Sequence, residues 1–187
     1  MGGLNAKRRN KAKAGKADGA MTELTILPET AEDAAAIDRL HERTFGPGRY
    51  AKTAYRIREG ISHSRDLSFT ARIGTLLVGS IWLSPIRIAS APALLLGPLT
   101  VEPPFRERGI GQALMERALS EARNQGHRLV VLVGDEPYYA RAGFKSVPKG
   151  QVTMPGPVDP ARLLVAELVD GAFEGVSGEI TPDWDAK

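Results

Sequence analysis

The sequence predicts an α/β (α+β) fold, a mixed sheet flanked by helices, from two patterns. First, an apolar segment over residues 94–101 is followed by a glycine-containing loop, a helical segment and a second apolar segment, Leu129–Val133. Strand, helix and strand in this order almost always form a right-handed crossover between parallel strands, so we expect the two segments side by side. Second, apolar and polar residues alternate over 67–71, and a short glycine turn joins them to a long second arm over 76–88, which is typical of an antiparallel hairpin.

Length and charge favour one domain with a basic extension. The chain has 187 residues, 42% of them hydrophobic, which is enough for one core and short for two. The net charge is +3, but residues 1–20 alone carry +5, which leaves residues 21–187 at −2. Those first residues are also rich in glycine and alanine and lack hydrophobic periodicity. We therefore expect a disordered basic extension over residues 1–21, with Met21 as an alternative start, and a single domain over residues 22–187.

The N-terminal half contains a short strand and one well-marked helix before the hairpin. Residues 24–26 favour a first strand. Thr30 followed by Asp33 is typical of a capped helix start, and the Gly-Pro-Gly string at 46–48 ends the helix. A second helical piece is expected over residues 51–59. One side of the first helix is formed by Ile37, Leu40, Thr44 and Phe45.

The C-terminal half contains a longer helix, a short one and a final strand. After the glycine-containing loop, apolar residues recur at helical spacing up to Gly126, which suits a C-terminal cap. Pro137 suits the first turn of a short helix that ends at Gly143. A further strand is expected over residues 163–169. The apolar side of the longer helix is formed by Ile110, Ala113, Leu114, Ala118 and Ala122.

The loop before the longer helix has the composition of an anion site. The first N–H groups of a helix have no acceptor within the helix, and the positive end of its dipole faces the loop. Gly109 and Gly111 lack a side chain and let a phosphate reach the backbone, while Arg106 and Arg108 add positive charge. This segment therefore predicts a site for a phosphorylated cofactor.

Two common phosphate motifs do not match the loop. The dinucleotide fingerprint needs Gly or Ala three residues after its second glycine, where this chain has Leu114. The P-loop needs Gly-Lys followed by Ser or Thr, a string that the sequence lacks. The remaining pattern, Arg106-x-x-Gly109-x-Gly111 after a strand, resembles the acyl-CoA pyrophosphate loop of the GNAT superfamily of N-acetyltransferases. A plain strand-to-helix turn is the structural alternative.

A second string supports the same resemblance. Residues 138–144 read YYARAGF, which is similar to the GNAT signature whose tyrosine, four residues before Gly-Phe, protonates the departing thiolate of CoA. That position is Tyr139, and the alternative is that both tyrosines only pack. Two segments of the C-terminal part resemble the YhbS-type branch of the superfamily; they read MPGPVDPARLLVAEL and GAFEGVSGEI. The resemblance covers most of residues 22–180 and implies a GNAT-like acyl-CoA N-acyltransferase fold, whose sheet is mostly antiparallel with a central parallel pair.

The resemblance implies transfer of an acetyl group from acetyl-CoA to a primary amine by direct attack. A lysine-like amine has a pKa of about 10.4, so a base or desolvation must supply its neutral form. Many members place an acidic side chain on the strand before the loop, where residues 94–96 are leucines here. Glu102 and Asp135, just past two strand ends, are the positional candidates for the base, and the N–H of Val101 is implied for the oxyanion. Cofactor contacts are expected at Leu99, Thr100, Val101, Arg106, Glu107, Arg108, Gly109, Ile110, Gly111, Gln112, Tyr138 and Arg141.

Composition narrows the remaining classes of function. The chain has no cysteine, and His41, His63 and His127 lack metal-ligand spacing, so we expect no metal. No apolar run approaches the roughly 20 residues of a membrane span, which favours a cytoplasmic protein. A basic arm can bind nucleic acid, but such arms are more often only solvated.

The expected partners are acetyl-CoA and an amine acceptor, either a small molecule or a protein, and a homodimer is left open. Two other functions remain as alternatives. One is a catalytically degenerate acyl-CoA-binding or interaction module on the same fold, and the other is a nucleic-acid binder that uses the basic arm. The sequence does not identify the acceptor.

Overall fold

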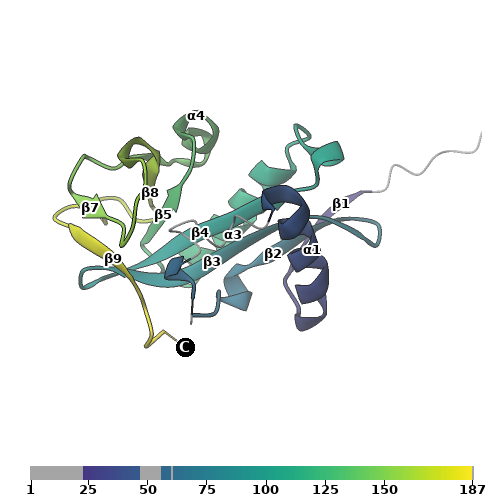
Figure 1. Cartoon of the computed structure of the whole chain (residues 1–187), viewed down its shortest axis with the longest axis horizontal. Coiled ribbons are helices and arrows are strands. Elements are labelled where there is room, and N and C mark those ends of the chain that lie inside the picture. The colour runs from purple at the N-terminus through teal and green to yellow at the C-terminus, as the bar shows by residue number, and fades with distance from the viewer. Residues whose placement is uncertain (1–22, 47–55, 60, 187) are drawn as a thin grey trace, which may run out of the picture.

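A nine-stranded sheet runs through the described part of the chain, residues 23–46, 56–59 and 61–186 of this computed structural model. The strands are β1 Leu24–Pro28, β2 Phe69–Ile73, β3 Leu76–Ile88, β4 Ala91–Val101, β5 Leu129–Val133, β6 Lys145–Ser146, β7 Val152–Thr153, β8 Leu163–Glu167 and β9 Gly178–Pro182. Their main order is β1-β2-β3-β4-β5-β8-β6, and β9 joins β3 and β7 at one end (Figure 1). The hairpin β2–β3 is antiparallel, and β4–β5 is parallel. The predicted mixed sheet with its central parallel pair is therefore confirmed.

Helices cover both faces of this sheet. Helix α1 (Ala34–Phe45) packs on β3 and β4, and α3 (Ile110–Asn124) packs on β2, β3 and β4 from the opposite face (Figure 1). Helix α4 (Glu136–Tyr139) is a single turn that continues into a 3-10 turn, Ala140–Ala142. Further 3-10 turns lie at 31–33, 65–67, 103–105 and 160–162.

Local sequence signals set the limits of the two long helices. The backbone N–H of Thr30 donates to the Asp33 carboxylate at 2.9 Å, which is half of the predicted capping box. Helix α1 ends at Gly46, and α3 ends just before Gly126, whose φ of 83° suits a residue without a side chain. The buried face of α3 consists of Ile110, Gly111, Leu114, Met115, Ala118, Leu119 and Ala122.

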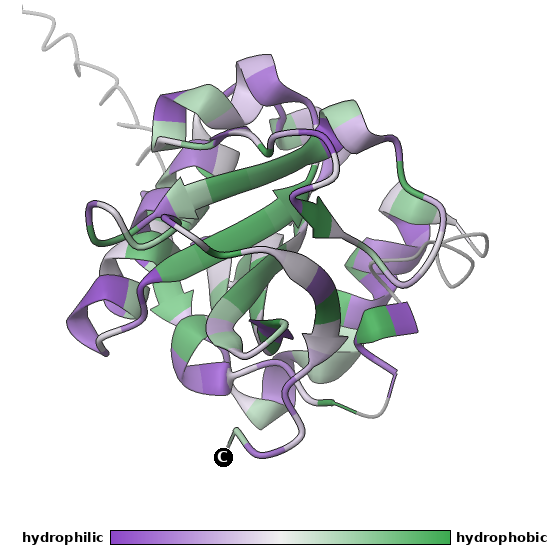
Figure 2. Cartoon of the chain, turned by 90° about the vertical axis from the view of Figure 1, so that its left-hand side faces the viewer, coloured by the Kyte–Doolittle hydropathy of each residue, from purple (hydrophilic) through white to green (hydrophobic). Residues whose placement is uncertain are grey.

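Three clusters of buried apolar side chains pack on the sheet, and two of them lie under the long helices. Phe69, Ile81 and Leu114 belong to a large cluster between the sheet and α3, and Ile37 and Leu40 belong to a small one under α1. Figure 2 shows strands that are apolar over most of their length, beneath helices and loops with hydrophilic outer surfaces. Burial of both faces explains why β4 and β5 have continuous rather than alternating apolar sequences.

The parallel pair β4–β5 is short. Its register has Leu94 beside Val130 and Leu95 beside Val131. The next residues of β4 include a cis Gly97–Pro98 peptide, and from Leu99 to Val101 the strand still pairs with β3. The two parallel strands therefore part toward their carboxyl ends, where open α/β sheets bind ligands.

Some expected elements differ from the structure or lie outside it. The final predicted strand ends at Glu167 instead of residue 169, and the short strands β6, β7 and β9 were not expected. Of the second helical piece, only residues 56–59 are described, and residues 56 and 57 are helical. The basic extension over residues 1–21 lies outside the described residues.

Candidate functional site

A cleft of about 650 Å³ opens where β4 and β5 part. The end of β4, the loop before α3, the first turn of α3 and the α4 segment contribute its walls, and the C-terminal end of α1 closes one side. The lining residues are Thr44, Phe45, Leu99, Val101, Phe105, Arg106, Glu107, Gly109, Ile110, Gly111, Gln112, Tyr138, Tyr139 and Arg141.

The loop that leads into α3 has a backbone that depends on glycine. Gly109 is the N-cap of α3 with a φ of 77°, a left-handed conformation that glycine adopts without strain. The Arg106 Nε donates to the Val101 carbonyl at 3.3 Å, and the Arg108 guanidinium lies over the Phe105 ring at 5.3 Å. The two cations thus flank the N-terminus of α3, where the helix dipole and the unpaired N–H groups favour an anion.

The side chain of Tyr138 lies across the first turn of α3. A Cβ built on Gly111 would come within 2.2 Å of the Tyr138 hydroxyl, so only glycine permits this approach. The Gln112 amide also donates to the Tyr138 carbonyl at 3.2 Å, which connects α3 to α4. Burial raises the pKa of Tyr138 although Arg141 acts in the opposite direction, so its hydroxyl is protonated at neutral pH.

Tyr139 is held at the carboxyl end of β5. A Cβ on Gly134 would lie 2.2 Å from Cε2 of Tyr139, and the ring meets Phe144 edge-on with centroids 6.0 Å apart. Burial, followed by the nearby Tyr138 and Asp135, raises the pKa of Tyr139 to about 12 against the opposing charge of Arg162. The hydroxyl is therefore a proton donor at any physiological pH.

The backbone of β4 presents donors to the cleft. Glu102 donates its N–H to the Val78 carbonyl at 2.8 Å, toward β3. Because successive peptide groups of a strand point to opposite edges, Leu99 and Val101 direct their N–H groups toward the β5 edge, from which β5 has already departed. A ligand in the cleft can therefore take these bonds in place of a strand.

The two carboxylates that the sequence offers as bases are both held by arginines. Glu102 pairs with Arg43 of α1, and Asp135 pairs with Arg162 at 3.2 Å. The Glu102 side chain is 16% exposed and that of Asp135 is 78% exposed. Among the described residues that line the cleft, neither carboxylate is present.

Most of the expected cofactor residues come together in the structure. All but Thr100 and Arg108 line the cleft with Tyr139; the Thr100 side chain is buried elsewhere, and Arg108 lies over Phe105. The sequence analysis missed Thr44, Phe45 and Phe105 as lining residues. Phe105 had a signal in its place just before the Arg-x-x-Gly-x-Gly string, whereas Thr44 and Phe45 reach the cleft only because α1 packs across β4.

Among the described residues, no helix combines the length and the apolar character that crossing a bilayer requires. No group of three or more His, Asp or Glu side chains in that part of the chain is placed to share a metal ion.

Two solved structures share this fold over most of the chain. E. coli YhbS, a GNAT family N-acetyltransferase in complex with CoA, is 26% identical with a TM-score of 0.75, covering 90% of this chain and 94% of its own. A GNAT family acetyltransferase from Brucella melitensis in complex with acetyl-CoA is 30% identical with a TM-score of 0.58, covering 82% and 99%.

Sequence comparison gives the same family. The chain is 29% identical over 117 residues to the uncharacterized N-acetyltransferase YjhQ of E. coli, and 45% identical over 62 residues to the uncharacterized N-acetyltransferase MJ1207 of Methanocaldococcus jannaschii. These matches cover 60% and 29% of this chain and only 65% and 27% of the two relatives. The model of the acetyltransferase (GNAT) family matches residues 34–144. With the cleft, the loop and the fold in agreement, the chain belongs to the GNAT family of acetyltransferases.

Proposed function

We propose that this protein is an N-acetyltransferase that moves an acetyl group from acetyl-CoA to a primary amine of an unidentified acceptor by direct attack. One observation carries the proposal: the loop at the N-terminus of α3 and Tyr139 line the same cleft, at the point where β4 and β5 part. Related structures with CoA and acetyl-CoA support the choice of donor.

The cleft offers a distinct partner for each part of the donor. The N–H groups at the start of α3 and Arg106 would bind the pyrophosphate, with Arg108 adding charge from the flank of the loop. The pantetheine arm would take the strand-like bonds of Leu99 and Val101. Tyr138 and Arg141, on the α4 side, would close the wall opposite β4.

The chemistry needs a donor for the thiolate and an acceptor for the amine proton. Tyr139 supplies the donor, since its raised pKa of about 12 keeps the hydroxyl protonated while the C–S bond breaks. The N–H of Val101 would stabilise the oxyanion of the tetrahedral intermediate. Glu102 and Asp135, acting through water, are the carboxylates proposed to take the amine proton.

A binding module without catalysis is the second candidate. The observation that favours it is the pairing of both carboxylates with arginines, because an ion-paired group outside the cleft is poorly placed to accept a proton. Such a module would bind acetyl-CoA through the same loop and strand but would release no thiol with amines.

The test separates these functions in one experiment. The full chain is incubated with acetyl-CoA and a panel of spermidine, L-lysine, tryptamine and a lysine-containing peptide, and free thiol is measured. CoA affinity is measured by calorimetry, and binding to RNA is measured at low and high salt. Thiol release that depends on an amine supports the transferase, whereas tight CoA binding without any turnover supports the module. Salt-sensitive RNA binding without CoA binding would contradict both.

A further inference from the structure

Three consecutive leucines of β4 show which groups lie on each face of the sheet. Leu94 and Leu96 belong to the large cluster under α3, whereas Leu95 belongs to the cluster that contains Ile57. Successive side chains of a strand point to opposite faces, so Ile57 lies on the face opposite α3. The short helical segment around Ile57 therefore covers the face that α3 leaves open.

Arg58, the next residue, reaches the point where β4 and β5 part. A Cβ built on Gly97 would lie 3.3 Å from the Arg58 Nη2, so the guanidinium stands over this glycine. Gly97 follows Leu95, the last residue of β4 that pairs with β5, by two positions, and it precedes Leu99 of the cleft by two. A half-buried cation is therefore placed at the opening between the parallel strands, on the face opposite α3.

Trp82 of β3 lies on the same face. Its neighbours Ile81 and Leu83 both belong to the cluster under α3, so the side chain between them points to the other side. The residues of β4 that pair with Ile81 and Leu83 flank the Gly97–Pro98 dipeptide. The partly exposed indole is therefore across from the glycine that Arg58 covers.

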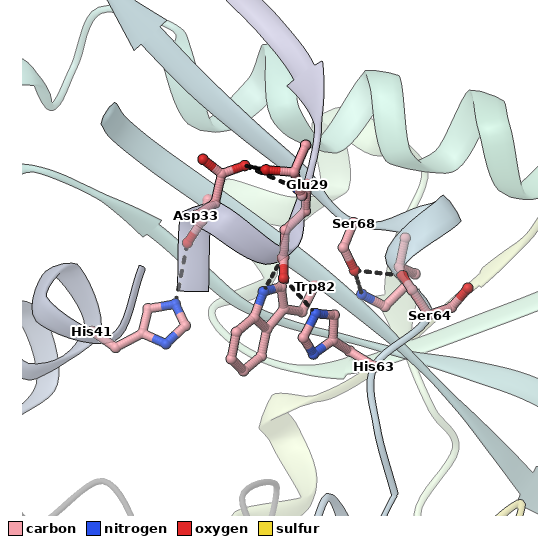
Figure 3. Close-up of polar contacts among 10 residues, drawn as sticks. Glu29, Asp33, His41, His63, Ser64, Ser68 and Trp82 are labelled. Atoms are coloured by element: carbon pink, nitrogen blue, oxygen red, sulfur yellow. Dashed lines mark hydrogen bonds and ion pairs between the residues drawn. The ribbon is translucent and has the colours of Figure 1, made fainter. Parts of the chain in front are cut away.

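Contacts with three other side chains fix the indole of Trp82. Figure 3 shows His41 and His63 on two sides of it. His41 meets the indole edge-on with centroids 4.7 Å apart, and His63 stacks on it at 4.1 Å. Glu29 accepts from the Trp82 Nε1 at 2.6 Å and lies 2.8 Å from the His63 Nε2. A ligand at the opening would therefore meet an aromatic side chain of fixed orientation beside the cation.

The sequence that leads to Arg58 is strongly basic. Residues 44–58 contain four basic side chains and no acidic one, a net charge of +4, although residues 21–187 together have a net charge of −2. Concentrated positive charge attracts anions and repels cations. This distribution favours an acceptor with a negative group over a polyamine. The four basic residues are Arg49, Lys52, Arg56 and Arg58.

The spacing along β4 limits the size of such an acceptor. A strand rises about 3.3 Å per residue, so Gly97 and Leu99 are about 7 Å apart. The amine and the carboxylate of one amino acid, from an α-amine to the ε-amine of lysine, are separated by about this distance or less. One small molecule can therefore contact Arg58 and still present its amine to the cleft.

We propose that the acceptor is a free amino acid, whose carboxylate is bound by Arg58 while its amine attacks the thioester. This inference rests on the proposed acetyltransferase function and names the class of its acceptor. The donor would occupy the α3 side of the opening, which leaves the side of Arg58 and Trp82 to the acceptor. A guanidinium has five N–H donors in a planar fork, so it can bind both carboxylate oxygens and still keep a contact with the protein.

The reaction then gives an N-acetyl amino acid and CoA. The acetyl carbon exchanges its C–S bond for a C–N bond, the amine releases a proton, and the thiolate takes one up. Spermidine and tryptamine have no carboxylate, and a lysine inside a protein has its own carboxyl group in a peptide bond. All three should therefore be poor acceptors.

The first test compares amino acids with their own amides, using acetyl-CoA as donor and free thiol as the readout. The acids are glycine, L-leucine, L-lysine and L-phenylalanine. An α-amine beside an amide has an ordinary pKa of about 7.7–8.0, lower than beside a carboxylate, so more of it is neutral at pH 7. A preference for the acid must therefore come from binding. For the best acid, kcat/KM should exceed that of its amide about 10- to 100-fold.

The second test uses Arg58→Gln and Arg56→Gln as a matched pair. Both remove one positive charge from the same short segment, but the Arg56 side chain is exposed. Arg58→Gln should raise the KM for the acid about 10- to 100-fold and bring the ratio of acid to amide close to one. Arg56→Gln should keep the wild-type ratio. A purely structural effect of Arg58→Gln would lower both rates together and leave the ratio unchanged.

Folding is checked by melting temperature and by acetyl-CoA affinity, both of which should match the wild type. Arg58→Lys keeps the charge without the planar fork, so it should retain only part of the preference for the acid. This variant decides the question if Arg58→Gln does not fold. Calorimetric titration of the amino acid into the protein saturated with CoA gives a readout that needs no turnover.

The outcomes distinguish this inference from the function on which it rests. If the wild type acetylates amines but prefers the amides, spermidine or O-phosphoethanolamine, the acceptor class is wrong and the transferase stands. The same conclusion follows if Arg58→Gln keeps the acid preference, or if Arg58 instead selects succinyl-CoA over acetyl-CoA. If the wild type acetylates no amine, the proposed function fails. Amino-acid binding to the CoA complex that Arg58→Gln abolishes would then still support the site, and no binding would overturn it.

Discussion

Two adjacent tyrosines in the α4 segment have different surroundings, although their side chains are chemically identical. Tyr138 is 42% exposed and lies across the start of α3, while Tyr139 is wedged between Gly134 and Phe144. Their rings meet edge-on with centroids 4.9 Å apart. Because burial acts more strongly on Tyr139, it is the better candidate for an acid that never loses its proton in the resting protein.

Tyr139→Phe tests that role. The ring and its packing remain, so the affinity for acetyl-CoA should change little. Turnover should fall about 10²- to 10⁴-fold, the usual contribution of a positioned general acid, because the departing thiolate loses its proton donor. Tyr138→Phe is the matched control for removing a hydroxyl from the same wall. Full turnover in Tyr139→Phe would leave the residue with a packing role only.

The pKa of Tyr139 gives a prediction that does not depend on catalysis. An ordinary tyrosine ionises near pH 10, whereas burial moves this transition upward to about 12. The phenolate absorbance of the wild type minus that of Tyr139→Phe should therefore rise near pH 12. The Tyr139 contribution to folding has the same sign: it is complete below pH 10 and is lost as the pH rises through 12. A difference curve centred at pH 10 would contradict the buried environment.

At the level of elements, α3 joins the core to the site. Its middle turns bury Leu114, Met115 and Ala118 against the sheet, and this packing fixes where its first turn points. The N–H groups of that turn face the cleft because the chain leaves β4 through a short 3-10 turn and enters the helix at Gly109. Anion binding here is thus a result of how the helix packs.

Gly109→Glu and Gly126→Glu form a matched pair for this element. Both glycines have positive φ, 77° and 83°, and a Cβ on either would meet no atom within 4 Å, so the backbone strain should be similar. Only Gly109→Glu brings a carboxylate to the N-terminus of α3. It should weaken CoA binding roughly 10- to 100-fold, which corresponds to about 1–3 kcal/mol of lost anion contacts. Equal CoA affinities in the two folded variants, measured by calorimetry, would remove the loop from the site.

At the level of the whole molecule, the charge is unevenly distributed along the sequence. Residues 1–20 have a net charge of +5, whereas the whole chain has a net charge of +3 because the remaining residues are slightly acidic. Their removal should lower the isoelectric point from about 9.3 to below neutral while leaving the melting temperature and CoA affinity unchanged. Isoelectric focusing and thermal unfolding of the two chains check this. A large drop in melting temperature would mean that the segment stabilises the folded domain.

The sequence predicted those parts of the molecule that local patterns determine. Nearby residues predict the hairpin and the crossover from β4 through α3 to β5, and both are present. They also predict the helix ends at Gly46 and Gly126, which the structure has. The strands β6, β7 and β9 were missed. Strands β6 and β7 form pairings of only two residues, which are too short to show a periodic pattern, and β9 pairs with β3, which is distant in the sequence.

The candidate site divides in the same way. The loop could be predicted because its glycines and arginines are adjacent in sequence. The contribution of Thr44 and Phe45 could not, because it depends on how α1 packs across β4. Nor could the approach of Tyr138 to Gly111, which joins two segments that are 27 residues apart.

The early parting of β4 from β5 has a consequence for hydrogen exchange. The amides of Leu99 and Val101 point to an edge that β5 has left, while that of Glu102 is bonded to β3. In the free protein the first two should exchange with deuterium faster than Glu102. Addition of CoA should slow both, as if a strand had been inserted, and leave Glu102 unchanged. The missing part of the sheet would then be supplied by a molecule that is not a polypeptide.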